Sequence, residues 1–292
     1  MTASPFEPAL QRIVLELRPY LDEVVIIGGW VPYLYQRYGE LPWQGNPSLT
    51  AEVDVLVERT IRPAGRVPIP DLLRHADFRP SRGEGGLAVW ERSLAAGEKI
   101  EFLVENGGTR AGEGAVVAVT EQAGMAAISL TGLELMRWFR RTLSIPVPDR
   151  DDQGGRVEIW LPLLGAYAVN KAGTFSRRRE LPGQGNPKQA KDLLYLRDLM
   201  AAGPAAVRMI QDDILEMTTD SVHGRGARAG VRDAANTLGL ALRGALRRIL
   251  PQVAAMLAER EPSFTQTAAL ADVEGHLTDL VEILEERAQE SR

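Results

Sequence analysis

Hydrophobic and polar residues follow one another with two different periods along this chain. In the first two thirds, short apolar runs rich in valine and isoleucine predict β-strands, with helical stretches between some of them. From Pro204 onward, apolar residues recur every three or four positions, which is the period of amphipathic helices. Residues 6–20 share this helical period, so we expect one helix near the N-terminus to pack on the sheet.

Taken together, these patterns predict an α+β fold. Strands are expected at 24–27, 52–57, 86–92, 99–104, 115–120, 128–130 and 157–161. Helices are expected at 31–38, 163–178, 188–200, 207–217, 231–250, 251–259 and 270–287, with Pro162 at a first helical position. Residues 133–141 fit a helix or a long strand, and 148–155 fit a turn or a domain hinge. The predicted architecture is an N-terminal mixed β-sheet core flanked by helices, residues 1–160, followed by a C-terminal helical domain, residues 161–292.

The stretch Val24 to Trp30 is the first candidate for a functional element. Four apolar residues predict a buried strand, and Gly28 and Gly29 follow it directly before a helix. Glycines at this position let the backbone turn and let another group approach closely. A helix N-terminus presents unpaired N–H groups and a positive dipole end, so this turn suits an anion such as a phosphate.

Three carboxylates are predicted to share one face of the sheet. In the strand 52–57, alternation places Glu52 and Asp54 on the face opposite the valines. Glu101 lies between Ile100 and Phe102, so it faces away from them. A solvent-facing sheet edge is one interpretation; the other is that a cation compensates the clustered charge. Mg²⁺ is the expected cation, because it takes oxygen ligands and retains water and substrate phosphates.

Two charged residues of the predicted helices are further candidates. Lys171 follows Tyr167 by four positions, so it lies toward the apolar stripe of its helix, where it either meets a charge or extends to solvent. An arginine-bearing turn at 177–179 follows, and then Lys191-Asp192-Leu193 in the next helix. Asp192 is either part of a site or an exposed helix residue with a salt-bridge partner.

These motifs resemble the polymerase-β-like nucleotidyltransferase superfamily, and within it the AbiEii/MenT-like family, over roughly residues 20–200. The resemblance implies that Gly28, Gly29, Glu52 and Asp54 bind nucleotide and metal. It also implies that Lys171 contacts the triphosphate and that Asp192 completes the site. The chain departs from the family pattern at Glu52, where aspartate is usual, and in the inserted loop 41–49.

The resemblance also implies a reaction and a set of partners. We expect a Mg²⁺-dependent transfer of NMP from an NTP to an acceptor hydroxyl, with metal held by Glu52, Asp54 and Glu101. Glu101 is expected to assist deprotonation of the acceptor hydroxyl, and Lys171 to neutralise charge on leaving pyrophosphate. Since the family includes the toxins of type IV toxin–antitoxin systems, the implied acceptor is RNA or tRNA, and a cognate antitoxin is a further implied partner.

A local excess of arginine lies in the C-terminal third of the chain. Between residues 221 and 250 there are six arginines and one acid, Asp233. This surface could contact RNA phosphates, dock an acidic partner, or simply be a solvated helix face. The arginines are Arg225, Arg228, Arg232, Arg243, Arg247 and Arg248.

Composition narrows the possible functions. The formal net charge is −5, so any nucleic-acid site must be local. The sequence holds no cysteine, and its three histidines are far apart, which argues against thiolate and histidine metal sites. It shows no secretory leader and no apolar run of membrane-spanning length, so we expect a cytoplasmic protein without membrane contact.

Two other functions fit parts of the same pattern. Small-molecule nucleotidyltransferases of the aminoglycoside-modifying kind also resemble the Gly-Gly-Trp turn followed by acid-x-acid. That interpretation predicts an acidic acceptor pocket for a cationic substrate. A catalytically degenerate nucleotide-binding or protein-interaction module is the non-enzymatic alternative.

Overall fold

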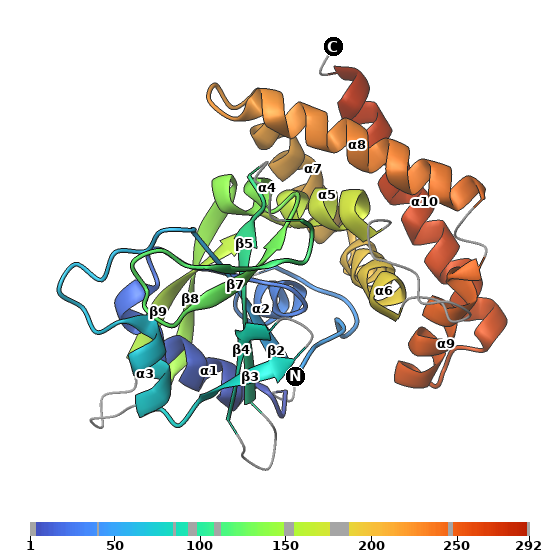
Figure 1. Cartoon of the computed structure of the whole chain (residues 1–292). Coiled ribbons are helices and arrows are strands. Elements are labelled where there is room, and N and C mark those ends of the chain that lie inside the picture. The colour runs from blue at the N-terminus through green and yellow to red at the C-terminus, as the bar shows by residue number, and fades with distance from the viewer. Residues whose placement is uncertain are drawn as a thin grey trace. The chain divides into compact units, whose positions relative to one another are not determined.

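A computed structural model describes residues 4–39, 41–83, 86–92, 98–107, 112–148, 155–175, 187–244 and 248–290. The chain forms two compact units, each made of two stretches of sequence (Figure 1). Unit 1 comprises Met1–Leu34 and Leu49–Pro162, and unit 2 comprises Tyr35–Ser48 and Leu163–Arg292. Of the helices in the described ranges, none is both long and apolar enough to cross a membrane.

Unit 1 is built on a mixed, open β-sheet. In the described ranges the strand order is β3-β4-β5-β2-β1-β9-β8, and β7 pairs with both β5 and β6. The strands are β1 (Val25–Ile27), β2 (Glu52–Val57), β3 (Arg79–Gly83), β4 (Gly86–Arg92), β5 (Glu98–Glu105), β6 (Val116–Ala118), β7 (Ala126–Leu130), β8 (Arg140–Val147) and β9 (Gly155–Pro162). The helices are α1 (Glu7–Glu16), the 3₁₀ turn η1 (Arg18–Tyr20), α3 (Ile69–His75), α4 (Glu134–Trp138) and the first part of α2 (Trp30–Tyr38), which continues into unit 2 from Tyr35.

The centre of the sheet joins strands that are distant in sequence. β1 runs antiparallel to β2, and β2 runs parallel to β5. Valine, isoleucine and phenylalanine fill one face of these strands: Val53, Val55, Ile100 and Phe102 are fully buried. The predicted alternation in both strands is therefore confirmed, because the charged positions between these residues stay half exposed.

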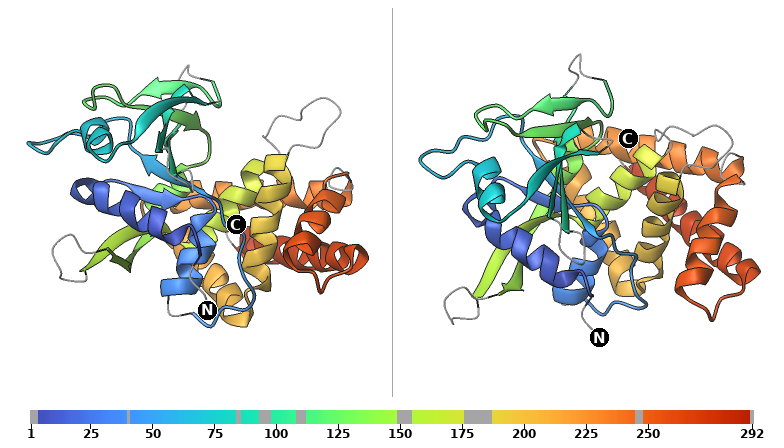
Figure 2. Two further views of the ribbon diagram at one scale, coloured as in Figure 1. Left: turned by 90° about the horizontal axis from the view of Figure 1, so that it is seen from below. Right: turned by 60° about the horizontal axis from the view of Figure 1, so that its bottom comes forward.

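Unit 2 contains a bundle of helices, coloured yellow-green to red in Figure 2. They are α5 (Leu164–Thr174), α6 (Pro187–Ala201), α7 (Pro204–Thr219), α8 (Gly224–Arg243), α9 (Leu250–Arg260) and α10 (Gln266–Glu290). Every residue of α5 from Leu164 to Gly173 is buried. A Cβ at Gly165 would lie 2.7 Å from the Asp213 Cβ, so only glycine lets α5 and α7 approach this closely.

Several expected boundaries differ from the structure. Residues 133–141, expected to be either a helix or a long strand, contain both, since α4 ends at Trp138 and β8 begins at Arg140. Pro162 is the last residue of β9 and not the first of a helix, because α5 begins only after Leu163. Residues 149–154 lie outside the described ranges, but the strands on both sides of them pair, with Val147 opposite Gly155.

The helix expected at 231–250 spans Gly224–Arg243 instead. Its start is glycine-rich, which argues against a helix on propensity alone. The Asp220 carboxylate accepts hydrogen bonds from the backbone N–H groups of Val222 and His223 just before the helix. A buried stripe of small and apolar residues then extends along it, so tertiary packing overrides the weak local propensity.

Candidate active site

The turn after β1 holds a glycine that no other residue could replace without strain. Gly28 has φ +73°, in the left-handed region that favours glycine. A Cβ built on Gly28 would lie 2.0 Å from Oδ2 of Asp54, so the carboxylate rests directly against the glycine backbone. The strand register explains this approach, because Ile27 is the partner of Asp54 in the β1–β2 pair. The close approach expected at Gly28 is therefore confirmed.

The start of α2 is fixed to the acidic strand by a second contact. The Trp30 indole Nε1–H donates a hydrogen bond to the Glu52 carbonyl oxygen at 2.9 Å. The Thr50 hydroxyl donates to the same oxygen at 3.0 Å. Trp30 is fully buried, so it is a core residue and offers no ring surface for stacking a base. The turn therefore contacts β2 at the Asp54 side chain and, through Trp30, at the Glu52 carbonyl.

The three predicted carboxylates do share one face of the sheet. In the parallel register, Asp54 of β2 lies opposite Glu101 of β5, and Glu52 lies opposite Lys99. Residues directly opposite each other on neighbouring strands project to the same side. On the other side of β5, Glu91 of β4 lies opposite Lys99. We call these five residues, Glu52, Asp54, Glu91, Lys99 and Glu101, the acidic face.

Lys99 is the member of the acidic face that was not singled out from the sequence. Its Nζ lies 3.1 Å from Oε2 of Glu52, and the two side chains are 32% and 35% exposed. Partial burial alone would lower the pKa of Lys99. The hydrogen bond to Glu52 and the negative charges of Glu52, Glu101 and Glu91 outweigh this effect, so the pKa is raised above its ordinary value. The available signal was its spacing, two positions before Glu101 on the same strand face.

The acidic face offers carboxylate oxygens, the donors that a divalent cation such as Mg²⁺ prefers. In the part of the chain that the structure describes, no group of three or more acidic, histidine or cysteine side chains is arranged to hold a metal ion. Mg²⁺ is commonly held by one or two carboxylates together with substrate phosphates and water. Asp54 and Glu101 are opposite each other and supply only oxygen donors, so their chemistry fits that mode.

Lys171 and Asp192 lie in unit 2, where they form a buried ion pair. The Lys171 Nζ lies 2.6 Å from Oδ1 of Asp192, and the two residues are 8% and 3% exposed. The rings of Tyr167 and Tyr195 flank the ammonium at 5.7 and 5.4 Å from their centroids. The pair joins α5 to α6. Lys171 therefore does not extend to solvent, and Asp192 is not an exposed helix residue.

The sequence-predicted site residues thus fall into two groups. Gly28, Gly29, Glu52, Asp54 and Glu101 belong to unit 1, where the turn and the acidic strands are in direct contact. Lys171 and Asp192 belong to unit 2 and contact each other. The loop with the arginine turn at 177–179 lies outside the described residues.

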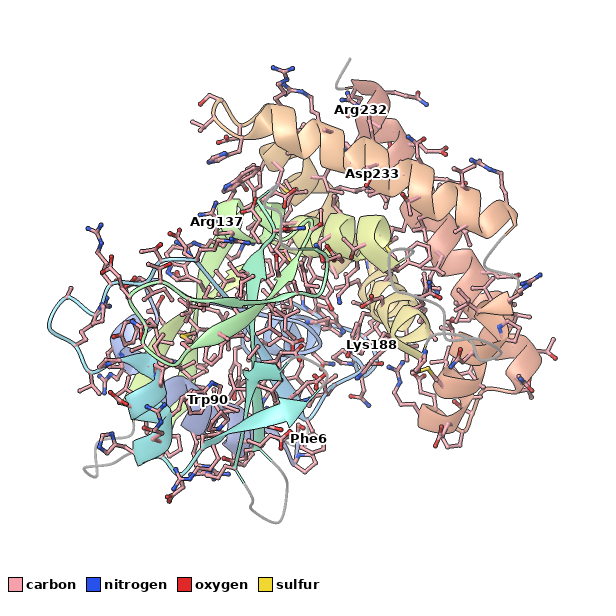
Figure 3. All side chains as sticks on the ribbon, viewed as in Figure 1. Phe6, Trp90, Arg137, Lys188, Arg232 and Asp233 are labelled. Carbon is pink, nitrogen blue, oxygen red and sulfur yellow. The ribbon has the colours of Figure 1, made fainter. Side chains whose placement is uncertain are left out.

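The arginines predicted to form an RNA-contacting surface differ in their exposure. Arg225, Arg232 and Arg243 are exposed on α8; Arg232 and its neighbour Asp233 are labelled in Figure 3. Arg228 is partly buried and donates a hydrogen bond to the Thr218 carbonyl oxygen. Arg247 lies outside the described residues. The three exposed arginines recur at helical spacing, so they share one side of α8.

Comparison with known proteins places the chain in a family. A family model described as nucleotidyltransferase matches residues 12–209, which is more than half of the chain. The chain therefore belongs to this nucleotidyltransferase family and is a transferase enzyme, with an NTP as substrate and NMP as the transferred group. No significant match was found among curated proteins or among solved structures. The helices α8, α9 and α10 lie beyond the matched residues.

Proposed function

We propose, starting from membership of a nucleotidyltransferase family, that this enzyme transfers NMP from an NTP to an acceptor hydroxyl at the acidic face of unit 1. The observation that carries the proposal is the contact between Gly28 and the Asp54 carboxylate. In this contact the glycine turn, which we propose as the phosphate cradle, lies against an acid that is itself opposite Glu101. These are the two elements that phosphoryl transfer needs, namely a cradle for phosphate and carboxylates for a cation.

Three carboxylates of the acidic face and the glycine turn beside it have proposed tasks. Asp54 and Glu101 would hold a divalent cation, expected to be Mg²⁺, with Glu52 as a third candidate ligand. When bound, such a cation neutralises triphosphate charge and orients the leaving group. The backbone N–H groups of Gly28 and Gly29, at the start of α2, would hold the phosphates.

The bond changes follow from these positions. The acceptor oxygen forms a bond to the α-phosphorus while the bond from that phosphorus to the bridging oxygen of the β-phosphate breaks. Pyrophosphate leaves with the bonding electron pair. The acceptor hydroxyl gives its proton to a carboxylate, for which we propose Glu101.

For Lys171 and Asp192 the proposal rests on the family resemblance, which gives the lysine a phosphate-contacting role. In unit 2 the lysine is held by Asp192 at 2.6 Å. We therefore propose that Asp192 acts on the reaction by positioning Lys171. Substitution of Asp192 with asparagine keeps a hydrogen-bonding group of the same size and is the appropriate first variant.

For the acceptor we propose RNA, with tRNA as the expected form. Support comes from the local positive charge of α8, carried by the exposed Arg225, Arg232 and Arg243 in a chain of net charge −5. Arginine surfaces of this kind contact phosphates in a salt-dependent way. The resemblance to the AbiEii/MenT-like family supports the further proposal of a type IV toxin with a cognate antitoxin. Growth arrest on expression, relieved by a neighbouring small gene, would test that role.

The central experiment measures transfer of label from each of the four α-labelled NTPs to RNA, with Mg²⁺ or Mn²⁺. Wild-type protein should label RNA, and Asp54→Asn should lower the rate about 1,000-fold, because it removes a carboxylate from the reaction centre. Asp22→Asn is the matched control, since Asp22 is an exposed acid of the same unit with a side chain 77% exposed.

Two results would contradict the proposal. Unchanged labelling by Asp54→Asn would show that the acidic face is not the reaction centre. Labelling of an aminoglycoside but not of RNA would support the small-molecule alternative.

A further inference from the structure

Lys99 occupies the middle of the acidic face. Its Cα is paired with that of Glu52 on one neighbouring strand and with that of Glu91 on the other. Glu101 lies two positions further along the same strand, on the same face. The ammonium group contacts Glu52, and the negative charges of Glu101 and Glu91 also act on it.

The sequence makes this lysine unusual. Lys99 is the only lysine among residues 1–162, although arginines are frequent there. A lysine ammonium is a compact charge on a flexible stem, whereas arginine presents a rigid fork suited to fixed bidentate pairing. Both Lys99 and Glu52 remain about one third exposed, so solvent and ions reach the pair. The pair is therefore open to exchange with another cation.

We infer that Lys99 is a resident counter-cation of the acidic face, which holds Glu52 and competes with a divalent cation for it. The inference rests on the proposed function, because the competing cation is the one proposed to bind Asp54 and Glu101. It gives Lys99 a positioning role, since the ammonium contacts Glu52 at 3.1 Å. It also makes Lys99 a determinant of metal affinity.

The expected consequence is opposite in sign to that of losing a metal ligand. Without Lys99, the acidic face keeps its carboxylates and loses one positive charge that repels a divalent cation. Metal binding should then become tighter, whereas removal of a ligand carboxylate makes it weaker. By Coulomb's law, an exposed unit positive charge a few ångströms from a metal site lowers the affinity of that site for a divalent cation by about tenfold.

The test measures Mn²⁺ binding to the NTP-free protein by electron paramagnetic resonance or calorimetry. We expect Lys99→Met to bind Mn²⁺ about tenfold more tightly than wild type, because methionine keeps much of the apolar stem without the charge. Lys99→Arg keeps the charge and should bind within about twofold of wild type. Arg62→Met removes an exposed cation of unit 1, with a side chain 78% exposed, and should leave the affinity unchanged.

A structural role for Lys99 would give a different result. Unfolding midpoints in chelator would fall for Lys99→Met, and Mn²⁺ affinity would stay equal to wild type or weaken. Either affinity outcome overturns the inference while leaving the proposed function in place. Absence of Mn²⁺ binding in every variant would overturn the inference together with the proposed metal ligands. RNA labelling in the same protein batch then shows whether transfer itself also fails.

Discussion

Two lysine–carboxylate pairs, Lys99 with Glu52 in unit 1 and Lys171 with Asp192 in unit 2, differ mainly in burial. Lys99 and Glu52 are 3.1 Å apart with side chains about one third exposed, whereas Lys171 and Asp192 are 2.6 Å apart with side chains 10% and 4% exposed. An exposed pair contributes little free energy because water and salt screen it. A buried pair has already lost its hydration, so each partner depends on the other. The same chemistry thus gives an exchangeable contact in unit 1 and a fixed one in unit 2.

The largest expected effect is in the buried pair. Asp192→Ala leaves the Lys171 ammonium buried without its carboxylate, so the free energy of unfolding should fall by about 3–5 kcal/mol. Urea denaturation followed by circular dichroism measures it. The double variant Lys171→Met with Asp192→Leu removes both charges and should recover most of that loss. If Asp192→Ala lowered the free energy of unfolding by less than about 1 kcal/mol, the buried pair would contribute no more to stability than the exposed pair.

The next effect is at the glycine turn beside the exposed pair. Gly28→Ala places a Cβ 2.0 Å from the Asp54 carboxylate, on a backbone with φ +73°. The acid must move, and a displacement of about 1 Å in a reaction centre costs roughly 100-fold in rate. RNA labelling measures the loss. Gly45→Ala is the control, because Gly45 has a similar φ of +70° but a Cβ there would meet nothing within 4 Å. If Gly45→Ala labels RNA at a rate close to wild type, the loss in Gly28→Ala comes from the displaced Asp54 carboxylate and not from backbone strain alone.

A smaller effect is expected on the arginine side of α8. Arg225→Gln with Arg232→Gln should weaken RNA binding and lower the slope of log affinity against log salt by roughly 1.4, at about 0.7 for each phosphate contact. Filter binding over a range of salt concentrations measures it. Arg208→Gln removes an exposed arginine of α7 and serves as the control. An unchanged slope in the double variant would assign RNA contact to other residues.

The smallest effect is in the exposed pair itself. Glu52→Gln should change the free energy of unfolding by less than about 1 kcal/mol at neutral pH. The pKa of Lys99 is raised in the folded protein, so its stabilising contribution is present below the ordinary value of 10.5 and is lost as pH rises through the raised pKa. The difference between wild type and Glu52→Gln should therefore be constant from pH 7 to 9 and shrink at higher pH. If Glu52→Gln instead lowered the free energy of unfolding by several kcal/mol, the Lys99–Glu52 pair would be as important for stability as the buried pair.

Local patterns were sufficient to predict much of unit 1. Alternation along 52–57 and 99–104 gave the faces of Asp54 and Glu101, because side-chain direction in a strand depends only on position. The close approach at Gly28 could likewise be predicted, since two glycines end a buried strand.

Pairings between distant segments could not be read in this way. That Lys99 lies opposite Glu52 depends on the register of two strands 47 residues apart, and no local pattern fixes that register. The partner of Lys171 is likewise on another helix. The helix α8 begins at Gly224 because its small residues pack within unit 2, which propensity does not report.

The path of the chain through the two units affects any attempt to produce them separately. The chain leaves unit 1 after residue 34, contributes residues 35–48 to unit 2, and then returns to unit 1. Within unit 2, the Ser48 N–H donates a hydrogen bond to the buried Asp198 carboxylate, and the Gln44 N–H donates one to the Ala202 carbonyl oxygen. A fragment that starts at residue 163 lacks this segment, and a fragment that ends at 162 carries it without its partners. Separate production of unit 2 would therefore need residues 35–48 joined to residues 163–292.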